Sequence, residues 1–260
     1  MILTLANQKG GVGKSTSAAA LAQAARYKGK KSLLIDLDPQ GNASYIMGAN
    51  LQARGSYELL VDHVPAADLI QHTPQGDVIA SSLQLAAADI KITEEEDRLF
   101  SLRNALKPIK DKYDLIVIDT PPVLNVLLYN ALNASDKVIV PLYADILSLQ
   151  GLYQLVHTIE RQQEENNKAL ELTGVFFNKH NTRTVLARDT METMKEKCAA
   201  MNVPVLKSTI RDAVAVREAQ TMQQSLFTYA PNSKPAEDYL SLLREVTKGK
   251  RIKFRIIGES

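Results

Sequence analysis

The feature of this 260-residue sequence that most restricts its fold is a series of short apolar runs that hardly alternate with polar residues. A strand with one solvent-exposed face alternates apolar and polar residues, so a continuous apolar run indicates a strand that is covered on both faces. Amphipathic stretches long enough for helices separate these runs. The order predicts an α/β fold with a doubly wound, mostly parallel sheet and helices on both faces. Strands are expected over 2–7, 32–36, 114–120, 137–142, 172–178 and 203–206, and helices over 15–28, 94–110, 125–134, 148–166, 183–201, 211–223 and 235–247.

A glycine-rich loop joins the first expected strand to the first expected helix. Its sequence, NQKGGVGKST (7–16), ends like the phosphate-binding motif G-x-x-x-x-G-K-[ST], but Gln8 replaces the first glycine and Lys9 follows it. Glycines let backbone N–H groups approach an anion closely, and the positive helix end favours one. We expect a P-loop NTPase site in which Lys14 reaches the β- and γ-phosphates and Ser15 ligates Mg²⁺. The residues expected to bind ATP here are Gly10, Gly11, Val12, Gly13, Lys14, Ser15 and Thr16.

Carboxylates stand at the ends of two further apolar runs, where a nucleotide site needs them. Asp119 ends LIVID and is predicted to hold Mg²⁺ as a Walker B aspartate; the alternative, a helix cap, is disfavoured by the following Thr-Pro-Pro. Asp36 and Asp38 end the run LLIDLD. We predict that Asp38 orients the attacking water or accepts its proton, and that Asp36 is a residue of the metal site or a structural residue.

The composition is that of an ordinary globular protein, with 45% hydrophobic and 23% charged residues. No apolar run approaches the roughly 20 residues that cross a bilayer, and the sequence starts without the basic front of a signal peptide. The single cysteine, Cys198, can form neither an internal disulfide nor a cysteine metal site alone. We expect a cytoplasmic protein with one P-loop ATPase domain over 1–247 and a basic C-terminal tail over 248–260.

Three motifs in combination resemble those of the deviant Walker A ATPases, and specifically the ParA/Soj-like partition ATPases. They are KGGVGKST (9–16), DLDPQGN (36–42) and LIVIDTPP (115–122). The family's order and spacing also appear in ADILSLQGLYQL (144–155), FNKHNTRT (177–184), IRDAVAVREA (210–219) and SKPAEDYLSLLREV (233–246). The resemblance covers nearly the whole chain. It implies an ATPase that uses Mg²⁺, hydrolyses ATP slowly and is stimulated by a partner.

The resemblance also assigns a role to the extra lysine. A lysine at the position of Lys9 crosses the interface of an ATP-sandwiched homodimer and contacts the phosphates bound by the other subunit. It would act like an arginine finger, supplying charge at the γ-phosphoryl group only after two subunits have closed. Similarity further suggests that Asn178 contacts the adenine base, although an asparagine at a strand end is also a common turn residue.

The basic surplus of the chain lies in its C-terminal third. Residues 1–178 carry 16 Lys and Arg against 20 Asp and Glu, whereas residues 179–260 carry 15 against 9. This imbalance suggests an anionic partner, although solvated helix faces give the same count. The segment 210–219 departs from the family's I-P-R-N-V-R-L-S-E-A. The nucleotide and DNA contacts that the resemblance implies for this segment are therefore the least transferable to this chain. The candidate DNA-binding residues are Arg217 and, on the preceding helix, Arg188, Lys195 and Lys197.

These features predict a dimeric ATPase that works as a switch in DNA segregation. The ATP dimer is expected to bind double-stranded DNA non-specifically, near the nucleoid, and to release it after hydrolysis stimulated by a ParB-type centromere-binding protein. The main alternative is a Min-type or other cargo-positioning ATPase that acts at the membrane through the tail. A metabolic ATP-dependent ligase is a third class, whose substrate pocket the sequence does not locate.

Overall fold

The computed structural model describes residues 1–93, 97–145, 147–179 and 185–248. Its strands form one seven-stranded sheet in the order β3-β4-β2-β5-β1-β6-β7. The strands are β1 (Ile2–Leu5), β2 (Ser32–Asp36), β3 (Gln71–Thr73), β4 (Gly76–Ile79), β5 (Leu115–Asp119), β6 (Lys137–Leu142) and β7 (Glu171–Phe177). All neighbouring pairs are parallel except β3 and β4. The predicted doubly wound, mostly parallel sheet is therefore confirmed.

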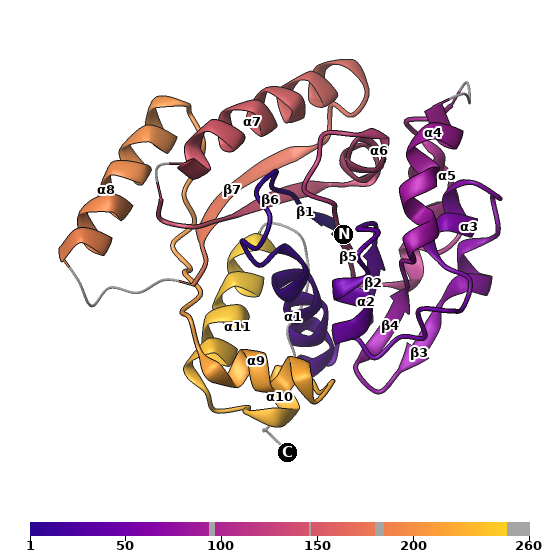
Figure 1. Ribbon diagram of the computed structural model, residues 1–260, viewed down its shortest axis with the longest axis horizontal. Coiled ribbons are helices and arrows are strands. Elements are labelled where there is room, and N and C mark those ends of the chain that lie inside the picture. The colour runs from indigo at the N-terminus through magenta and orange to yellow at the C-terminus, as the bar shows by residue number, and fades with distance from the viewer. Residues whose placement is uncertain (94–96, 146, 180–184, 249–260) are drawn as a thin grey trace.

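Helices cover both faces of this sheet (Figure 1). One face carries α1 (Lys14–Tyr27), α2 (Asn42–Ile46), α9 (Val214–Thr221), α10 (Leu226–Tyr229) and α11 (Lys234–Val246). The other carries α3 (Ser56–Leu60), α4 (Ala88–Thr93), α5 (Ser101–Leu106), α6 (Val126–Ala134), α7 (Leu147–Glu165) and α8 (Val185–Ala200). None of the helices, over the residues described, is long and apolar enough to span a membrane.

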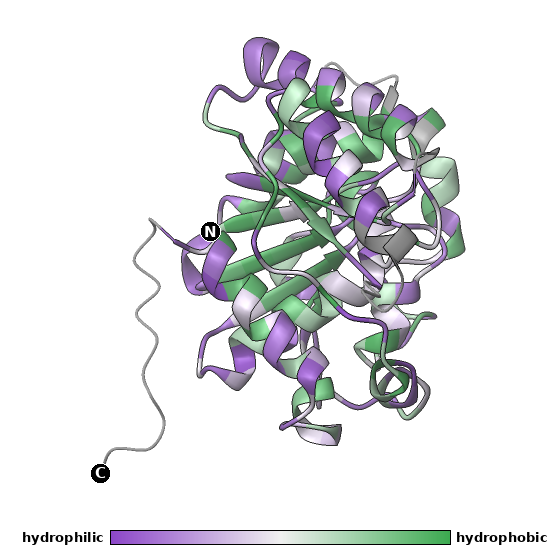
Figure 2. Ribbon diagram, turned by 90° about the vertical axis from the view of Figure 1, so that its left-hand side faces the viewer, coloured by the Kyte–Doolittle hydropathy of each residue, from purple (hydrophilic) through white to green (hydrophobic). Residues whose placement is uncertain are grey.

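The sheet is apolar on both sides because each strand sends consecutive residues to opposite faces. Leu34 packs into the cluster around α1 and α11, whereas its neighbour Leu33 packs into the cluster around α5 and α6. Figure 2 shows the strands as a hydrophobic band inside more polar helices. This double burial is the reason why the apolar runs of the sequence do not alternate.

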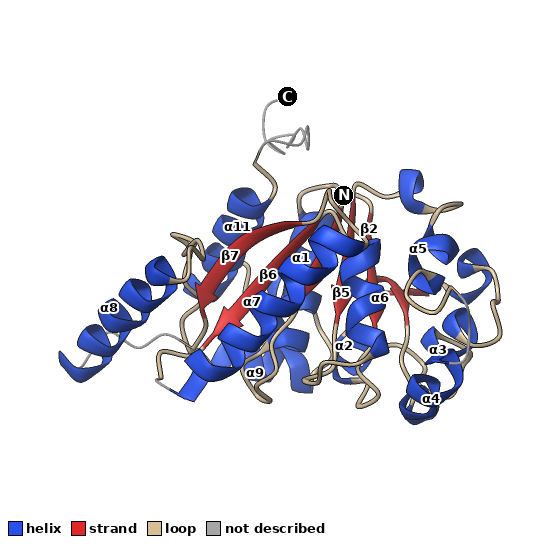
Figure 3. Cartoon of the chain, turned by 90° about the horizontal axis from the view of Figure 1, so that it is seen from above, coloured by secondary structure: helices blue, strands red, loops and turns tan. Residues whose placement is uncertain are grey.

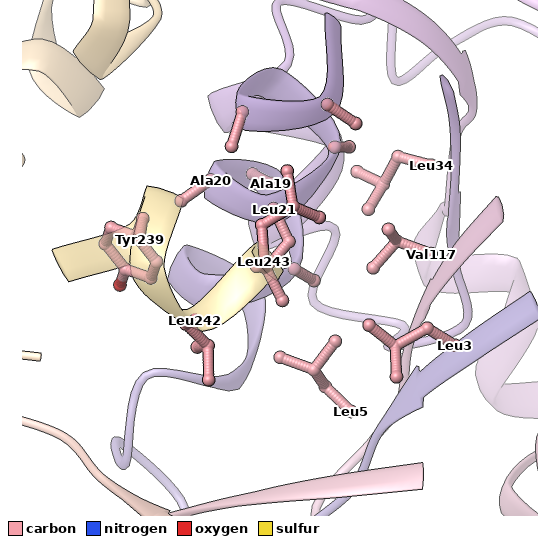
Figure 4. Close-up of a cluster of buried hydrophobic side chains, with 14 of the residues drawn as sticks. Leu3, Leu5, Ala19, Ala20, Leu21, Leu34, Val117, Tyr239, Leu242 and Leu243 are labelled. Carbon is pink, nitrogen blue, oxygen red and sulfur yellow. The ribbon is translucent and has the colours of Figure 1, made fainter. Parts of the chain in front are cut away.

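Helix α1 lies between the sheet and α11, and six of its 14 residues are alanine. Ala18, Ala19, Ala20, Ala22, Ala24 and Ala25 are each at most 5% exposed. Figure 4 shows α11 bringing Tyr239, Leu242 and Leu243 against this helix, with Leu3 and Leu5 of β1 across from them. The Tyr239 hydroxyl also lies 3.2 Å from that of Ser17. The small side chains let α1 pack closely on both neighbours.

Both edges of the sheet differ from the sequence prediction. The expected strand 203–206 makes only an isolated bridge, from Val205 to Val175. Conversely, the hairpin of β3 and β4 was not predicted, although the turn between Thr73 and Gly76 contains Pro74, a turn signal. Both strands are so short that periodicity alone cannot identify them.

The expected helix over 94–110 is also wrong as a single element. In the described residues, α4 ends at Thr93 and α5 begins at Ser101. The start of α5 is set by Asn130 of α6, whose side-chain oxygen accepts the Leu102 N–H at 3.0 Å. Its Nδ2 donates to the Arg98 carbonyl at 2.7 Å. A cap supplied by a distant helix leaves no local sequence signal.

Candidate nucleotide site

The glycine-rich loop leaves the carboxyl end of β1, the strand between β5 and β6 at the centre of the sheet. Gly11 and Gly13 have φ of +73° and +86°, in the left-handed region that favours glycine. A Cβ at Gly13 would also collide with the Asn178 side-chain amide. No side chain caps the start of α1, and its first turn holds no acidic residue. The helix start is therefore open to an anion.

A cavity of 680 Å³ lies over this loop. The loop contributes Gly10, Gly11, Gly13, Lys14, Ser15 and Thr16 to its lining. The other walls are formed by Asp38, Gln40, Asn42, Tyr45, Ile46, Pro122, Lys179, Arg217, Gln220 and Thr221. Among the predicted loop residues, Val12 is fully buried and does not line the cavity. The volume falls in the range of pockets that hold small ligands and cofactors.

Asp119 is the buried carboxylate best suited to a cation. It pairs in register with Asp36 on the neighbouring strand, and both side chains are fully buried. Burial and the charge of Asp36 raise the pKa of Asp119 well above its ordinary value, which the Ser15 hydroxyl and Lys14 only partly offset. Neither Asp119 oxygen has a hydrogen bond of ordinary geometry in the described chain. Unpartnered carboxylate oxygens beside Ser15 fit an oxygen-coordinated cation such as Mg²⁺.

Asp36 has its hydrogen bonds made within the protein. Its Oδ2 accepts the Ser44 N–H at 2.8 Å and the Ser44 hydroxyl at 2.7 Å, and its Oδ1 accepts the Asp38 N–H at 3.0 Å. Burial outweighs these bonds and raises the pKa of Asp36 to about 6. Asp36 is thus placed to fix the backbone that carries Asp38, whereas Asp119 has oxygens free for a metal.

Asp38 and Lys14 both line the cavity. Asp38 is 7% exposed, and its Oδ1 accepts the Gln40 N–H at 3.0 Å, which fixes the carboxylate at the cavity wall. Lys14 is buried and donates from Nζ to the Lys9 carbonyl at 3.3 Å. Burial lowers the pKa of Lys14, and the charges of Asp119 and Asp38 offset this in part. The Lys14 ammonium is thus placed where the charges of both carboxylates act on it.

The Lys9 side chain turns away from this cavity and is held within its own subunit. Its Nζ lies 2.7 Å from Asp145 Oδ2 and 3.3 Å from the Ser148 hydroxyl. Burial alone would raise the pKa of Asp145, but the hydrogen bonds from Lys9 and Ser148 outweigh it and lower that pKa. The Lys9 ammonium also sits 5.9 Å from the centre of the Tyr143 ring.

Asn178 lies behind the loop rather than in the cavity wall. Its Nδ2 donates to the Val12 carbonyl at 2.8 Å, and its Oδ1 accepts the Lys179 N–H at 2.9 Å. Sequence reasoning did not single out Lys179, which lines the cavity and sits 5.2 Å from the Tyr143 ring centre. It also missed Gln220, whose side chain donates to the Thr16 hydroxyl at 2.8 Å. No sequence motif points to Gln220, and only the fold shows that it lies next to Thr16.

The four candidate DNA-binding residues come from two helices that Figures 1 and 3 show at separate places. Arg217 of α9 pairs with Asp212 at 2.9 Å and lines the nucleotide cavity. On α8, Lys195 pairs with Glu192 at 2.7 Å, and Lys197 is exposed in the last turn. The Arg188 side chain lies outside the part of the chain that is described. Two of the four candidate cations, Lys195 and Arg217, are therefore paired with carboxylates of the same chain.

Ionisation of Asp36 should make the stability of the ligand-free protein depend on pH. In an unfolded chain this carboxyl loses its proton near pH 3.9, whereas in the fold it keeps it up to about pH 6. The free energy of unfolding should therefore fall as pH rises through this window, by about 2 kcal/mol. Urea denaturation at pH 4.5 and 6.5 would measure how steeply the free energy of unfolding changes with pH. Asp36→Asn should show a smaller slope, and an equal slope in both proteins would contradict the assignment.

Comparison with known proteins places this site in a family. Residues 1–172 match the family model described as an AAA domain. The Bacillus subtilis sporulation initiation inhibitor protein Soj is 38% identical over 250 residues, covering 94% of this chain and 97% of Soj. A cobyrinic acid a,c-diamide synthase from Mycobacterium smegmatis, solved with ADP and magnesium, is 29% identical with a TM-score of 0.83, covering 98% of each chain. A plasmid partition protein from Borrelia burgdorferi is 30% identical with a TM-score of 0.73, covering 95% of this chain and 97% of that one. The chain therefore belongs to the AAA domain family and is a P-loop ATPase of the Soj and ParA type.

Proposed function

We propose that this chain is an ATP-dependent switch for DNA segregation. It binds ATP with Mg²⁺, closes into a homodimer around two nucleotides, binds double-stranded DNA without sequence preference in that state, and releases it after hydrolysis. A ParB-type centromere-binding protein would stimulate the slow reaction. The observation that carries the proposal is the division of charge: Lys14 faces the chain's own phosphate cavity, whereas Lys9 lies outside it.

In the proposed reaction the loop positions the triphosphate and the carboxylates arrange the attack. Backbone N–H groups at the start of α1 and Lys14 would hold the β- and γ-phosphates. Ser15 and Asp119 would hold Mg²⁺, which when bound offsets charge on the phosphate oxygens. Asp38, fixed by Gln40, would orient the attacking water or accept its proton.

Dimerisation completes the site because one charge is missing from the isolated subunit. Lys9 is paired with Asp145 in its own chain and does not line the cavity. Reaching the partner's phosphates would require this pair to open. Hydrolysis would then depend on two subunits meeting, which ties turnover to the DNA-bound form.

The function is tested by comparing partners and nucleotides in one set of measurements. We expect the full chain with ATP and Mg²⁺ to bind unrelated DNA duplexes with similar affinity, and to bind weakly with ADP. Anionic phosphatidylglycerol vesicles should give no ATP-dependent binding. Vesicle binding without DNA binding would instead favour the Min-type alternative, and equal DNA binding with ADP would contradict the switch.

A further inference from the structure

A group of cations that form no ion pair within the described residues lies at the edge of the sheet opposite the nucleotide loop. It comprises residues at the end of α1, in the turn that follows, and in the 3₁₀ helix Lys110–Lys112 ahead of β5. The members of this basic edge cluster are Arg26, Lys28, Lys30, Lys31, Lys110 and Lys112. Lys31 directly precedes β2, and Lys112 stands three residues before β5. Two segments far apart in sequence thus bring their cations to the same edge.

The basic edge cluster is too far from the nucleotide cavity to share its ligand. Helix α1 has 14 residues, with Lys14 at its first turn and Arg26 in its last. At 1.5 Å per residue its two ends are about 20 Å apart. Figure 3 shows the amino terminus, which marks this edge, on the side opposite α2 and α9. A ligand of the cluster is therefore not the nucleotide.

Four of the six cations line a cavity of 420 Å³. They are Arg26, Lys30, Lys31 and Lys112. Two carboxylates lie close to the cluster in the chain: Asp114 accepts the Lys31 N–H at 2.9 Å, and Asp111 stands between Lys110 and Lys112. The one carboxylate in the lining, Asp77, accepts the Tyr113 hydroxyl at 2.8 Å and lies 2.7 Å from His72 Nδ1. In the described chain, none of the six cluster cations forms an ion pair with a carboxylate.

Helix geometry explains only part of this arrangement. The carboxyl end of a helix favours cations, which accounts for Arg26 and Lys28. It does not account for Lys110 and Lys112, which come from another segment. Like charges gathered around one cavity repel each other, so the arrangement costs stability unless an anion is bound.

We propose that the basic edge cluster binds the phosphate backbone of duplex DNA. The inference rests on the proposed function for its ligand but places the contacts away from α8 and α9. A membrane surface fits less well because interfacial binding needs exposed apolar side chains. The one large exposed apolar residue of the segment 26–31 is Tyr27, and its ring stacks on Phe227 at 5.4 Å.

Contacts of this kind have a measurable signature. Each lysine that neutralises a phosphate releases a counterion, so affinity falls with salt more steeply as contacts increase. Binding through phosphates is indifferent to base sequence. A dimer closed around ATP would carry the basic edge cluster once on each subunit, at the ends farthest from the nucleotides, so each cluster contributes its own phosphate contacts.

The test compares two double variants of the full chain. Lys30→Ala with Lys112→Ala removes two cations from the cavity wall. Lys168→Ala with Lys234→Ala removes two exposed cations elsewhere. With ATP and Mg²⁺, we expect the first variant to lose about tenfold or more in affinity for a random duplex and to lower the salt slope by about two per subunit. The control variant should bind like the parent protein, and both should keep the parent's hydrolysis rate without DNA.

Further arms separate the possible outcomes. Lys30→Arg with Lys112→Arg should retain binding, because charge rather than side-chain length carries the contact. A chain ending at residue 248 measures the tail separately. If the parent protein binds DNA but the alanine pair leaves affinity and salt slope unchanged, the inference fails while the proposed function stands. Absence of DNA binding by the parent in every nucleotide state would overturn both. Loss of phosphatidylglycerol vesicle binding rather than DNA binding would reassign the surface to membranes.

Discussion

Lys9→Ala should abolish ATP hydrolysis while leaving ATP binding intact, whereas Lys14→Ala should abolish ATP binding itself. Lys14 lines the phosphate cavity, but Lys9 lies outside it, paired with Asp145. A charge supplied from a second subunit at the γ-phosphoryl group is worth about 10³- to 10⁵-fold in rate. Fluorescent ATP binding and phosphate release, measured on the same samples, would give the two quantities independently.

Two controls make the test of Lys9 specific. Asp145→Asn removes the partner that holds Lys9 but keeps the lysine, so hydrolysis should persist. Mixing the two inactive lysine variants should restore hydrolysis, because a Lys14→Ala subunit still carries the Lys9 that the other site needs. A Lys9→Ala protein that hydrolyses ATP at the parent's rate as a single subunit would show that the lysine does not act between subunits.

Asp38→Ala should accumulate as an ATP-bound dimer that does not turn over. Asp38 lines the cavity and is fixed by Gln40, while our proposal assigns the phosphates to Lys14 and the metal to Ser15 and Asp119. Removing the group that orients water stops hydrolysis without removing nucleotide ligands, at a cost of about 10²- to 10⁴-fold in rate. Size-exclusion chromatography with ATP and Mg²⁺ would detect the trapped dimer.

Asp119→Asn is the matched control for the Asp38→Ala variant. It replaces the carboxylate whose oxygens have no hydrogen-bond partner in the described chain, so Mg²⁺-dependent nucleotide binding should weaken. The two aspartates are therefore expected to fail in different ways. An Asp38→Ala protein that binds ATP yet elutes as a monomer would count against its assigned role.

The parts of the fold that the sequence predicted are those whose signals are local. Unbroken apolar runs identified β1, β2, β5, β6 and β7, and the glycines around Lys14 identified the turn from β1 into α1. Asp36 and Asp119 could be placed together because both end strands that turned out to be neighbours. Each of these inferences needed only residues close together in the chain.

The parts that were missed depend on contacts between distant segments. Asn130 sets the start of α5 from another helix, and the pairing of Lys9 with Asp145 joins residues 136 positions apart. Gln220 reaches Thr16 across 204 positions. The basic edge cluster likewise becomes a cluster only when β2 and β5 lie side by side. No periodicity or motif encodes such pairs.

The alanine-filled core around α1 sets which variants the chain can tolerate. The helix that presents Lys14 and Ser15 is confined by the sheet on one side and α11 on the other, and Ala19 and Ala24 are fully buried between them. A bulkier residue there displaces the whole helix, and its first turn moves with it. Genetic screens for lost nucleotide binding would therefore return lesions buried well away from any phosphate.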